Sequence, residues 1–157
     1  MREFEELLAE HPFFQGLSPQ HLHMVANCAA EDSFDAGSYI FREGEQAERF
    51  YVLRKGKVAL EALAAPRGPL TVETIEAGEA LGWSWFFPPY RWQFSARVLE
   101  PTQALIMDGV CLRTKCEEDP EFGYTFLKRL TQIVMHRLQA TRLQLLDIYA
   151  IPTRGGR

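Results

Sequence analysis

The sequence predicts a mainly β domain, in which a jelly-roll β-roll (a double-stranded β-helix) is flanked by N-terminal helices and a long C-terminal helix. Three observations predict this class. Helical spacing of apolar residues is confined to the two ends of the chain. The stretch between them holds short β-type runs separated by turn residues. Two of those turns contain Gly44 and Gly56, at points where a reversing chain favours positive φ.

The N-terminal helices are expected within residues 3–30. Phe4–Ala9 is typical of a short helix that ends before Pro12. Ser18 is expected to cap a second helix that has Pro19 at its first position. The apolar residues of this second helix, at helical spacing, are Leu22, Val25, Ala26 and Ala29.

The β-roll is expected over residues 33–108. Its candidate strands are Ser38–Arg42, Phe50–Lys55, Lys57–Ala64, Leu70–Ile75, Gln93–Leu99 and Gln103–Met107. The turns between them are expected at Asp35–Gly37, Glu43–Gly44, Lys55–Gly56, Pro66–Pro69, Ala77–Gly78 and Glu100–Pro101. Many short strands with such turns favour a barrel or jelly roll over an α/β fold.

The C-terminal helices are expected over residues 109–149, with a first helix at 109–118. Asp119 is expected to cap a long second helix that begins with Pro120 and ends near Tyr149. Its apolar residues cover an arc wider than one contact stripe, and they include Leu130, Ile133, Val134, Leu138 and Leu145. We therefore expect a homodimer through this helix, although the N-terminal helices could instead cover the second face. Residues 1–150 are predicted to form one domain, followed by a flexible tail at 151–157.

Composition limits the classes of function. The chain has 157 residues and a formal net charge of -4, which suits a single globular domain and disfavours nonspecific nucleic-acid binding. It has no apolar run of about 18 residues, so we expect no membrane span. Its acidic N-terminus lacks an apolar signal region, which predicts a cytoplasmic protein.

Three cysteines, Cys28, Cys111 and Cys116, are an odd number and argue against a disulfide framework. The spacing of Cys111 and Cys116 matches no zinc or iron–sulfur knuckle. The expectation is three ordinary reduced thiols, with a redox-sensing role as the alternative.

Two phrases carry a resemblance to a known family. The first runs from Ile40 to Val58, and the second is Gly78-Glu79-Ala80-Leu81-Gly82. Together they resemble the cyclic nucleotide-binding domain, the sensory β-roll of catabolite-activator-type regulators and of cyclic-nucleotide-dependent kinases and channels. The resemblance covers roughly Phe13 to Tyr149. It implies a regulatory domain without catalysis, which binds cyclic AMP, cyclic GMP or a related small anion.

The same resemblance implies how a signal leaves the domain. In such regulators the long helix moves against the roll, and a helix-turn-helix domain follows it. Only a short tail follows Tyr149 here, so we expect no DNA binding and output to a protein effector.

The resemblance also implies ligand residues. In the family a Gly-Glu pair opens the phosphate-binding cassette, the Glu binds the ribose, and an arginine near the end binds the phosphate. Gly78 and Glu79 match the opening, and Gly82 would allow close backbone approach. The chain then departs, and a cassette longer by about three residues puts the phosphate arginine at Trp92 in the strand register. Neighbouring Arg91 is therefore the candidate phosphate ligand.

The remaining candidates have two interpretations each. The aromatic residues are most simply core and lid packing, or else they line a stacking pocket; they are Trp83, Trp85, Tyr90 and Trp92. Leu81 belongs to the cassette, and Ser84 or Ser95 could donate to an anion. On the long helix, Thr141 is the candidate base contact, while Arg137 and Arg142 are expected on a solvated face.

Other classes of function have less support in the sequence. Within the same fold, a degenerate cassette could bind another small molecule or serve as a protein-interaction or dimerisation module. A cupin-type metal enzyme needs histidines on strands. The histidines fall in the helical parts; they are His11, His21, His23 and His136. No metal is expected, and a haem sensor using His136 or a cysteine stays open.

Overall fold

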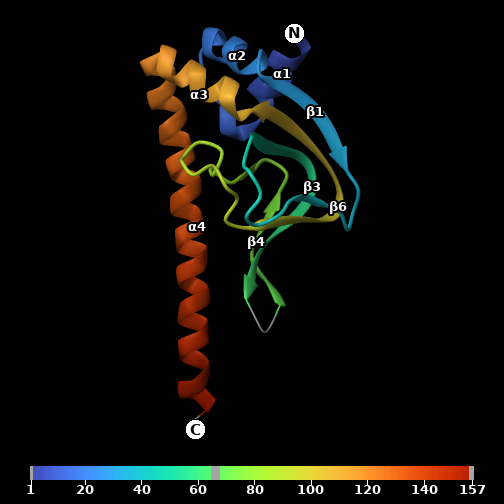
Figure 1. Cartoon of the computed structure of the whole chain (residues 1–157), viewed down its shortest axis with the longest axis vertical. Coiled ribbons are helices and arrows are strands. Elements are labelled where there is room, and N and C mark those ends of the chain that lie inside the picture. Colours follow the sequence, from blue (N-terminus) through green and yellow to red (C-terminus); the bar gives the residue numbers. More distant parts are fainter. Residues whose placement is uncertain (1, 65–67, 156–157) are drawn as a thin grey trace.

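The described strands form one antiparallel sheet of six strands that winds into a roll, with helices at one end and along one side (Figure 1). A computed structural model describes residues 2–64 and 68–155. The elements in chain order are α1 (Arg2–Glu10), the 3-10 helix η1 (Pro12–Phe14), α2 (Pro19–Ala26), β1 (Ala29–Phe34), β2 (Tyr39–Phe41), β3 (Arg49–Ala64), β4 (Gly68–Glu76), β5 (Ala80–Leu81), β6 (Ser95–Asp108), α3 (Gly109–Glu118) and α4 (Pro120–Gly155). The main strand order is β1-β6-β3-β4, with β2 beside β6 and β5 beside β3. The predicted fold class is confirmed.

Side-chain caps begin two helices at the predicted places. Ser18 Oγ accepts a hydrogen bond from the His21 amide at 3.2 Å at the start of α2. Asp119 Oδ1 accepts one from the Phe122 amide at 3.2 Å at the start of α4. Each cap is followed by a proline, which needs no amide partner in the first turn.

Two predicted turns, Lys55–Gly56 and Glu100–Pro101, lie inside long strands. β3 and β6 each run through the point where the sequence suggested a reversal, and their register shifts several times there. Gly56 does have positive φ, at 105°, but a Cβ at this position would lie 2.3 Å from Thr102 Oγ1. Glycine is needed at this position because the two strands approach each other closely, and the chain continues without reversing.

Two strands were missed by the sequence analysis. β1 pairs with β6 from Ala29↔Met107 onward, although Ala29 was assigned to a helix. Most side chains of β1 are exposed, so its sequence shows no clear alternation of apolar and polar residues. β5 has two residues and pairs with β3. The predicted turn at Pro66–Pro69 lies partly outside the described residues.

α4 lies along the roll and extends past it (Figure 1). It continues beyond the predicted end at Tyr149, so the tail expected to be flexible is helical up to Gly155. Gln144 Nε2 donates to the carbonyl oxygens of Thr71 at 3.2 Å and Val72 at 2.9 Å, on the outer strand β4. None of the helices in the described part of the chain is long and apolar enough to cross a membrane.

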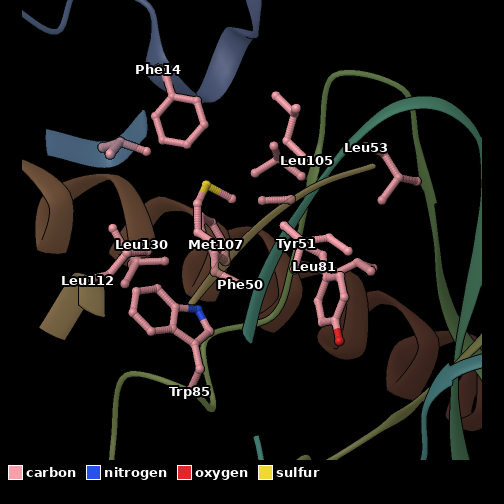
Figure 2. Packing of buried hydrophobic residues seen from close by; sticks show 14 of the residues in the cluster. Phe14, Phe50, Tyr51, Leu53, Leu81, Trp85, Leu105, Met107, Leu112 and Leu130 are labelled. Atoms are coloured by element: carbon pink, nitrogen blue, oxygen red, sulfur yellow. The ribbon is translucent and has the colours of Figure 1, made fainter. Parts of the chain in front are cut away.

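The core joins the roll to the helices through large aromatic side chains (Figure 2). Trp85, Phe50 and Phe126 are fully buried. The ring centroid of Trp85 lies 5.1 Å from that of Phe50 on β3 and 5.8 Å from that of Phe126 on α4. The first third of α4 is therefore part of the hydrophobic core, and Trp85 has the packing role expected of it.

A disulfide links Cys28 to Cys111, across 83 residues of sequence. It ties the residue just before β1 to α3. The expectation of three reduced thiols is therefore wrong for two of them, because an odd number of cysteines also permits one pair and one free thiol. Cys116 is free and half-buried, and its burial raises the pKa of the thiol to about 12.

Candidate functional site

The cassette opens four residues later than the sequence suggested. Gly78 and Glu79 form the turn between β4 and β5, where the Gly78 amide donates to the Leu53 oxygen and the Leu53 amide donates to the Glu79 oxygen, both at 2.9 Å. The long loop that could hold a ligand follows β5, so its first two residues are Gly82 and Trp83. A tryptophan thus stands where the resemblance implied a ribose-binding glutamate.

Glu79 faces α4 and not the cassette loop. Its Oε1 accepts a hydrogen bond from the Glu76 amide at 2.7 Å. The side chain lines a cavity of about 260 Å³ between the roll and α4, together with Glu73, His136 and Arg137. The predicted ribose ligand is therefore part of a mixed, charged groove beside the helix.

Arg91 lies on the outer side of the loop. Its side chain is exposed, and Nη1 donates to the Gly44 oxygen at 3.0 Å. Its backbone pairs with Gln46 in an isolated β-bridge. The structure does not bring Arg91 and Glu79 together, so the pair expected to bind ribose and phosphate is separated.

Aromatic side chains fill the inside of the cassette. Trp92 is 4% exposed, and its ring stacks on Phe41 with 3.7 Å between centroids and 7° between planes. A Cβ on Gly82 would lie 2.9 Å from the Trp92 ring, so packing alone accounts for this glycine. The space left beside Trp83 and Phe94 is about 10 Å³, room for at most one water molecule.

Arg137 of α4 enters this aromatic region. It is 4% exposed, and its Nε donates to Glu73 Oε1 at 2.5 Å. The guanidinium carbon lies 5.2 Å from the ring centroid of Trp83 and 6.0 Å from that of Phe94, within cation–π range. Burial lowers the pKa of Arg137, and the carboxylate of Glu73 opposes that change.

Arg137 was expected on a solvated face, and this prediction is wrong because the side chain is buried. The inward-facing residues of α4 continue at steps of three and four, and one more follows seven residues later; they are Phe122, Phe126, Leu130, Ile133, Arg137 and then Gln144. Extending the apolar series by one step would have found Arg137. A buried arginine is otherwise rare unless it is paired, and its partner on β4 could not be read from spacing.

The other candidates have mainly structural contacts. Leu81 is fully buried, and Ser84 is 9% exposed. Ser95 Oγ accepts from the Glu43 amide at 2.8 Å. Thr141 Oγ1 donates to the Arg137 oxygen of its own helix at 2.9 Å. The Arg113 guanidinium stacks on the Tyr90 ring at 4.1 Å, which ties the loop to α3.

Within residues 2–64 and 68–155, two groups of histidine and carboxylate side chains come together that the sequence did not indicate. In each group the possible ligand atoms lie within 4.8 Å of one another. One group is Glu73, Glu79 and His136, and the other is His21, Asp119 and Glu121. The expectation of no metal stays a prediction.

The fold has counterparts among known proteins. The family model for the cyclic nucleotide-binding domain matches residues 31–119, more than half of the chain. The chain belongs to the cyclic nucleotide-binding domain family. A curated relative is the CRP-like cAMP-activated global transcriptional regulator of Mycobacterium tuberculosis, 28% identical over 145 residues. That match covers 92% of this chain and 62% of the regulator, so the chain spans less than two thirds of its length.

A second relative matches a shorter stretch. The cGMP-dependent protein kinase 2 of Mus musculus is 30% identical over 81 residues, which are 51% of this chain and 11% of the kinase. These proteins are regulators or contain regulatory domains, and the kinase carries its catalysis elsewhere in a much longer chain.

Solved structures agree on the fold. A protein of Geobacter metallireducens GS-15, named for cyclic nucleotide binding, superposes with a TM-score of 0.77 at 29% identity, covering 85% of this chain and 97% of that one. The sensor domain of the regulator DNR from Pseudomonas aeruginosa superposes with a TM-score of 0.70 at 24% identity, covering 88% and 93%. The second likeness shows the fold alone.

Proposed function

We propose that this chain is a regulatory module in which α4 reports the state of the cassette to a partner. The observation that carries the proposal is the side chain of Arg137. It belongs to the long helix, yet it is buried against Trp83 of the cassette and paired with Glu73 of the roll. Any ligand or partner that rearranges the cassette must also change the contacts of α4, and this coupling is what a switch needs.

The geometry favours a closed cassette that does not bind free cyclic AMP or cyclic GMP. Stacked aromatic rings leave about 10 Å³ inside it. Glu79 and Arg91, the residues expected to hold ribose and phosphate, face different parts of the surface. This supports the alternative in which a degenerate cassette serves as an interaction or dimerisation module.

One observation favours a second candidate, in which a cyclic nucleotide or a related anion still binds after the cassette opens. A buried phosphate needs a cationic partner, and Arg137 offers a guanidinium inside the aromatic region. The anion would then replace Glu73 as the partner of Arg137. In this candidate Arg91 plays no part.

Calorimetric titration with cyclic AMP and cyclic GMP tests the two candidates. We expect no binding by the wild type up to millimolar nucleotide. Binding that is lost in Arg137→Ala and retained in the matched variant Arg91→Ala would establish the second candidate instead. If binding is lost in Arg91→Ala, both candidates are wrong, and Arg91 is the phosphate ligand that the resemblance implied.

The proposed assembly is a homodimer through α4. Leu127 is 40% exposed, Leu138 67% and Leu145 50%. They belong to a series that alternates in steps of four and three, the spacing of a coiled-coil seam. The series is Leu127, Thr131, Val134, Leu138, Thr141 and Leu145. It lies on a different face of the helix from the residues that meet the roll, so a second copy can cover it.

The mass in solution tests this assembly. Light scattering at micromolar concentration should give twice the chain mass for the wild type. Leu138→Glu places a charge in the seam and should give the mass of one chain, while Gln139→Glu, one residue outside the seam, should stay dimeric. A wild-type mass of one chain would mean that the partner covering this face is a different protein.

The site of action and the downstream partner are part of the same proposal. We propose a protein effector and no DNA binding, and we propose a cytoplasmic location. The disulfide is the observation that weighs against that location, because disulfides are rare in the cytosol. A salt-sensitive gel shift that prefers one operator over random DNA would contradict the proposal on DNA.

A further inference from the structure

We propose that the roll carries a binding site for a flat organic cation of the guanidinium class, and that Arg137 of α4 fills this site in the resting protein. The inference rests on the closed cassette of the proposed function. It assigns to the same region a ligand of the opposite charge to the phosphate that binds in the family.

The site consists of the roll residues that surround the Arg137 side chain. Glu73 of β4 presents a carboxylate whose side chain is 9% exposed. Trp83 and Phe94 present two ring faces toward the same point, at 5.2 Å and 6.0 Å from the guanidinium carbon. A buried carboxylate beside aromatic faces is the arrangement that recognises organic cations.

The charges around this point also suit a cation. Burial lowers the pKa of Arg137, and the charge of Glu79, a second carboxylate, opposes that change together with Glu73. On α4, His136 Nε2 lies 3.1 Å from Glu73 Oε2, and His136 is mostly exposed. Arg129 lines the same cavity, but its guanidinium donates to backbone oxygens near η1. Removing Arg137 therefore leaves two carboxylates, faced by His136 and by the Arg129 guanidinium, whose hydrogen bonds go to backbone oxygens.

There is room for a small ligand. Arg137 lines both the aromatic pocket and the adjoining cavity of about 260 Å³, so its side chain forms part of the wall between them. Turning it outward joins the two spaces. The combined space is near the lower end of ligand pockets, which begin at about 300 Å³, and suits a guanidinium or amidinium group with a short chain.

Guanidinium is favoured over a simple amine for a physical reason. It is planar, weakly hydrated and able to form parallel hydrogen bonds with a carboxylate while it stacks on an aromatic ring. A free ligand must compete with Arg137, whose effective concentration at the site is on the order of millimolar or more. Capture of the ligand expels Arg137, so binding loosens the hold of α4 on the roll.

The test removes Arg137 and supplies the cation from solution. In Arg137→Ala, ethylguanidinium should raise the melting temperature in a saturable manner, by about 3–6 °C at about ten times its Kd. It should also change the tryptophan fluorescence, because Trp83 lines the site. In the wild type the same probe should bind at least about tenfold more weakly, because Arg137 competes.

Three controls make the result decisive. Ethylurea has nearly the same shape without the charge and should give no saturable shift. Arg129→Ala loses an arginine of the same helix outside the aromatic faces, and the double variant Glu73→Gln/Arg137→Ala loses the carboxylate. Arg129→Ala keeps Arg137 paired with Glu73 and should respond only as weakly as the wild type, while the double variant should give no saturable shift. The proposal would be overturned if ethylurea gave the same shift as ethylguanidinium in Arg137→Ala, or if a control variant responded as strongly as Arg137→Ala. It would also be overturned if Arg137→Ala folds and responds to neither probe. Nucleotide titrations and the solution mass are independent readouts of the proposed function.

Discussion

Removal of the bridge between Cys28 and Cys111 should destabilise the protein strongly. The bridge closes a loop with a sequence separation of 83 residues. The loop-entropy relation gives about 4.5 kcal/mol of stabilisation at 25 °C for a separation of this length. Measured losses on removing native disulfides are typically about 2–5 kcal/mol, so the expected value lies in the upper part of that range.

The assay is urea unfolding of the double variant Cys28→Ala/Cys111→Ala beside the oxidised wild type. Both cysteines are replaced because a single change would leave a new free thiol. Cys116→Ala is the matched control, since it removes the free thiol and retains the bridge. Addition of a reductant should lower the free energy of unfolding of the wild type and of the control, and should leave the double variant unchanged.

Two results would refute this reasoning. Titration of thiols in the denatured, unreduced protein should find one thiol, and three would show that no bridge forms. A double variant within about 0.5 kcal/mol of the wild type would show that the bridge does not restrict the unfolded chain as the relation assumes.

The remaining predictions concern the core and one buried histidine. Phe126→Ala should cost about 3–5 kcal/mol in urea unfolding, because the ring is fully buried among other aromatic rings, while exposed Leu143→Ala should cost less than about 0.5 kcal/mol. His11 Nδ1 accepts from the Phe13 amide at 3.1 Å, so the ring is neutral and Nε2 donates to the Leu53 oxygen at 2.8 Å. Burial lowers the pKa of His11 below 6.5, the unfolded chain therefore binds the proton more readily, and stability should fall as the pH drops below about 6.5. Urea midpoints at pH 7.5 and 5.5 should differ less in His11→Gln than in the wild type, and an equal difference would remove His11 as the cause.

Local signals in the sequence predicted much of the fold. The cap and proline pairs at Ser18 and Asp119 fixed two helix starts, because a cap acts within one turn of its own residue. The glycine phrases identified the roll. They gave a wrong prediction at Gly56, because its positive φ belongs to a close approach of two strands and not to a turn. A single sequence does not distinguish these two uses of glycine.

Features that depend on distant residues were harder to predict. The pairing of Cys28 with Cys111 depends on where β1 and α3 meet, and β1 itself had no visible alternation. Arg137 was taken as solvated because its partner Glu73 lies on β4, 64 residues away in sequence. The start of the cassette was predicted four residues too early, because Gly78-Glu79 has the expected residue types but forms the turn before the loop.

The contacts of Gln144 indicate a second structural role for α4. Its amide donates to two carbonyl oxygens of β4, the last strand of the main order, and these acceptors could otherwise pair with a strand of another molecule. If α4 moves away from the roll as proposed, that edge becomes open to intermolecular strand addition. A helix with the proposed signalling role would then also protect the protein from fibre-like self-association, and we expect the state with α4 released to be short-lived.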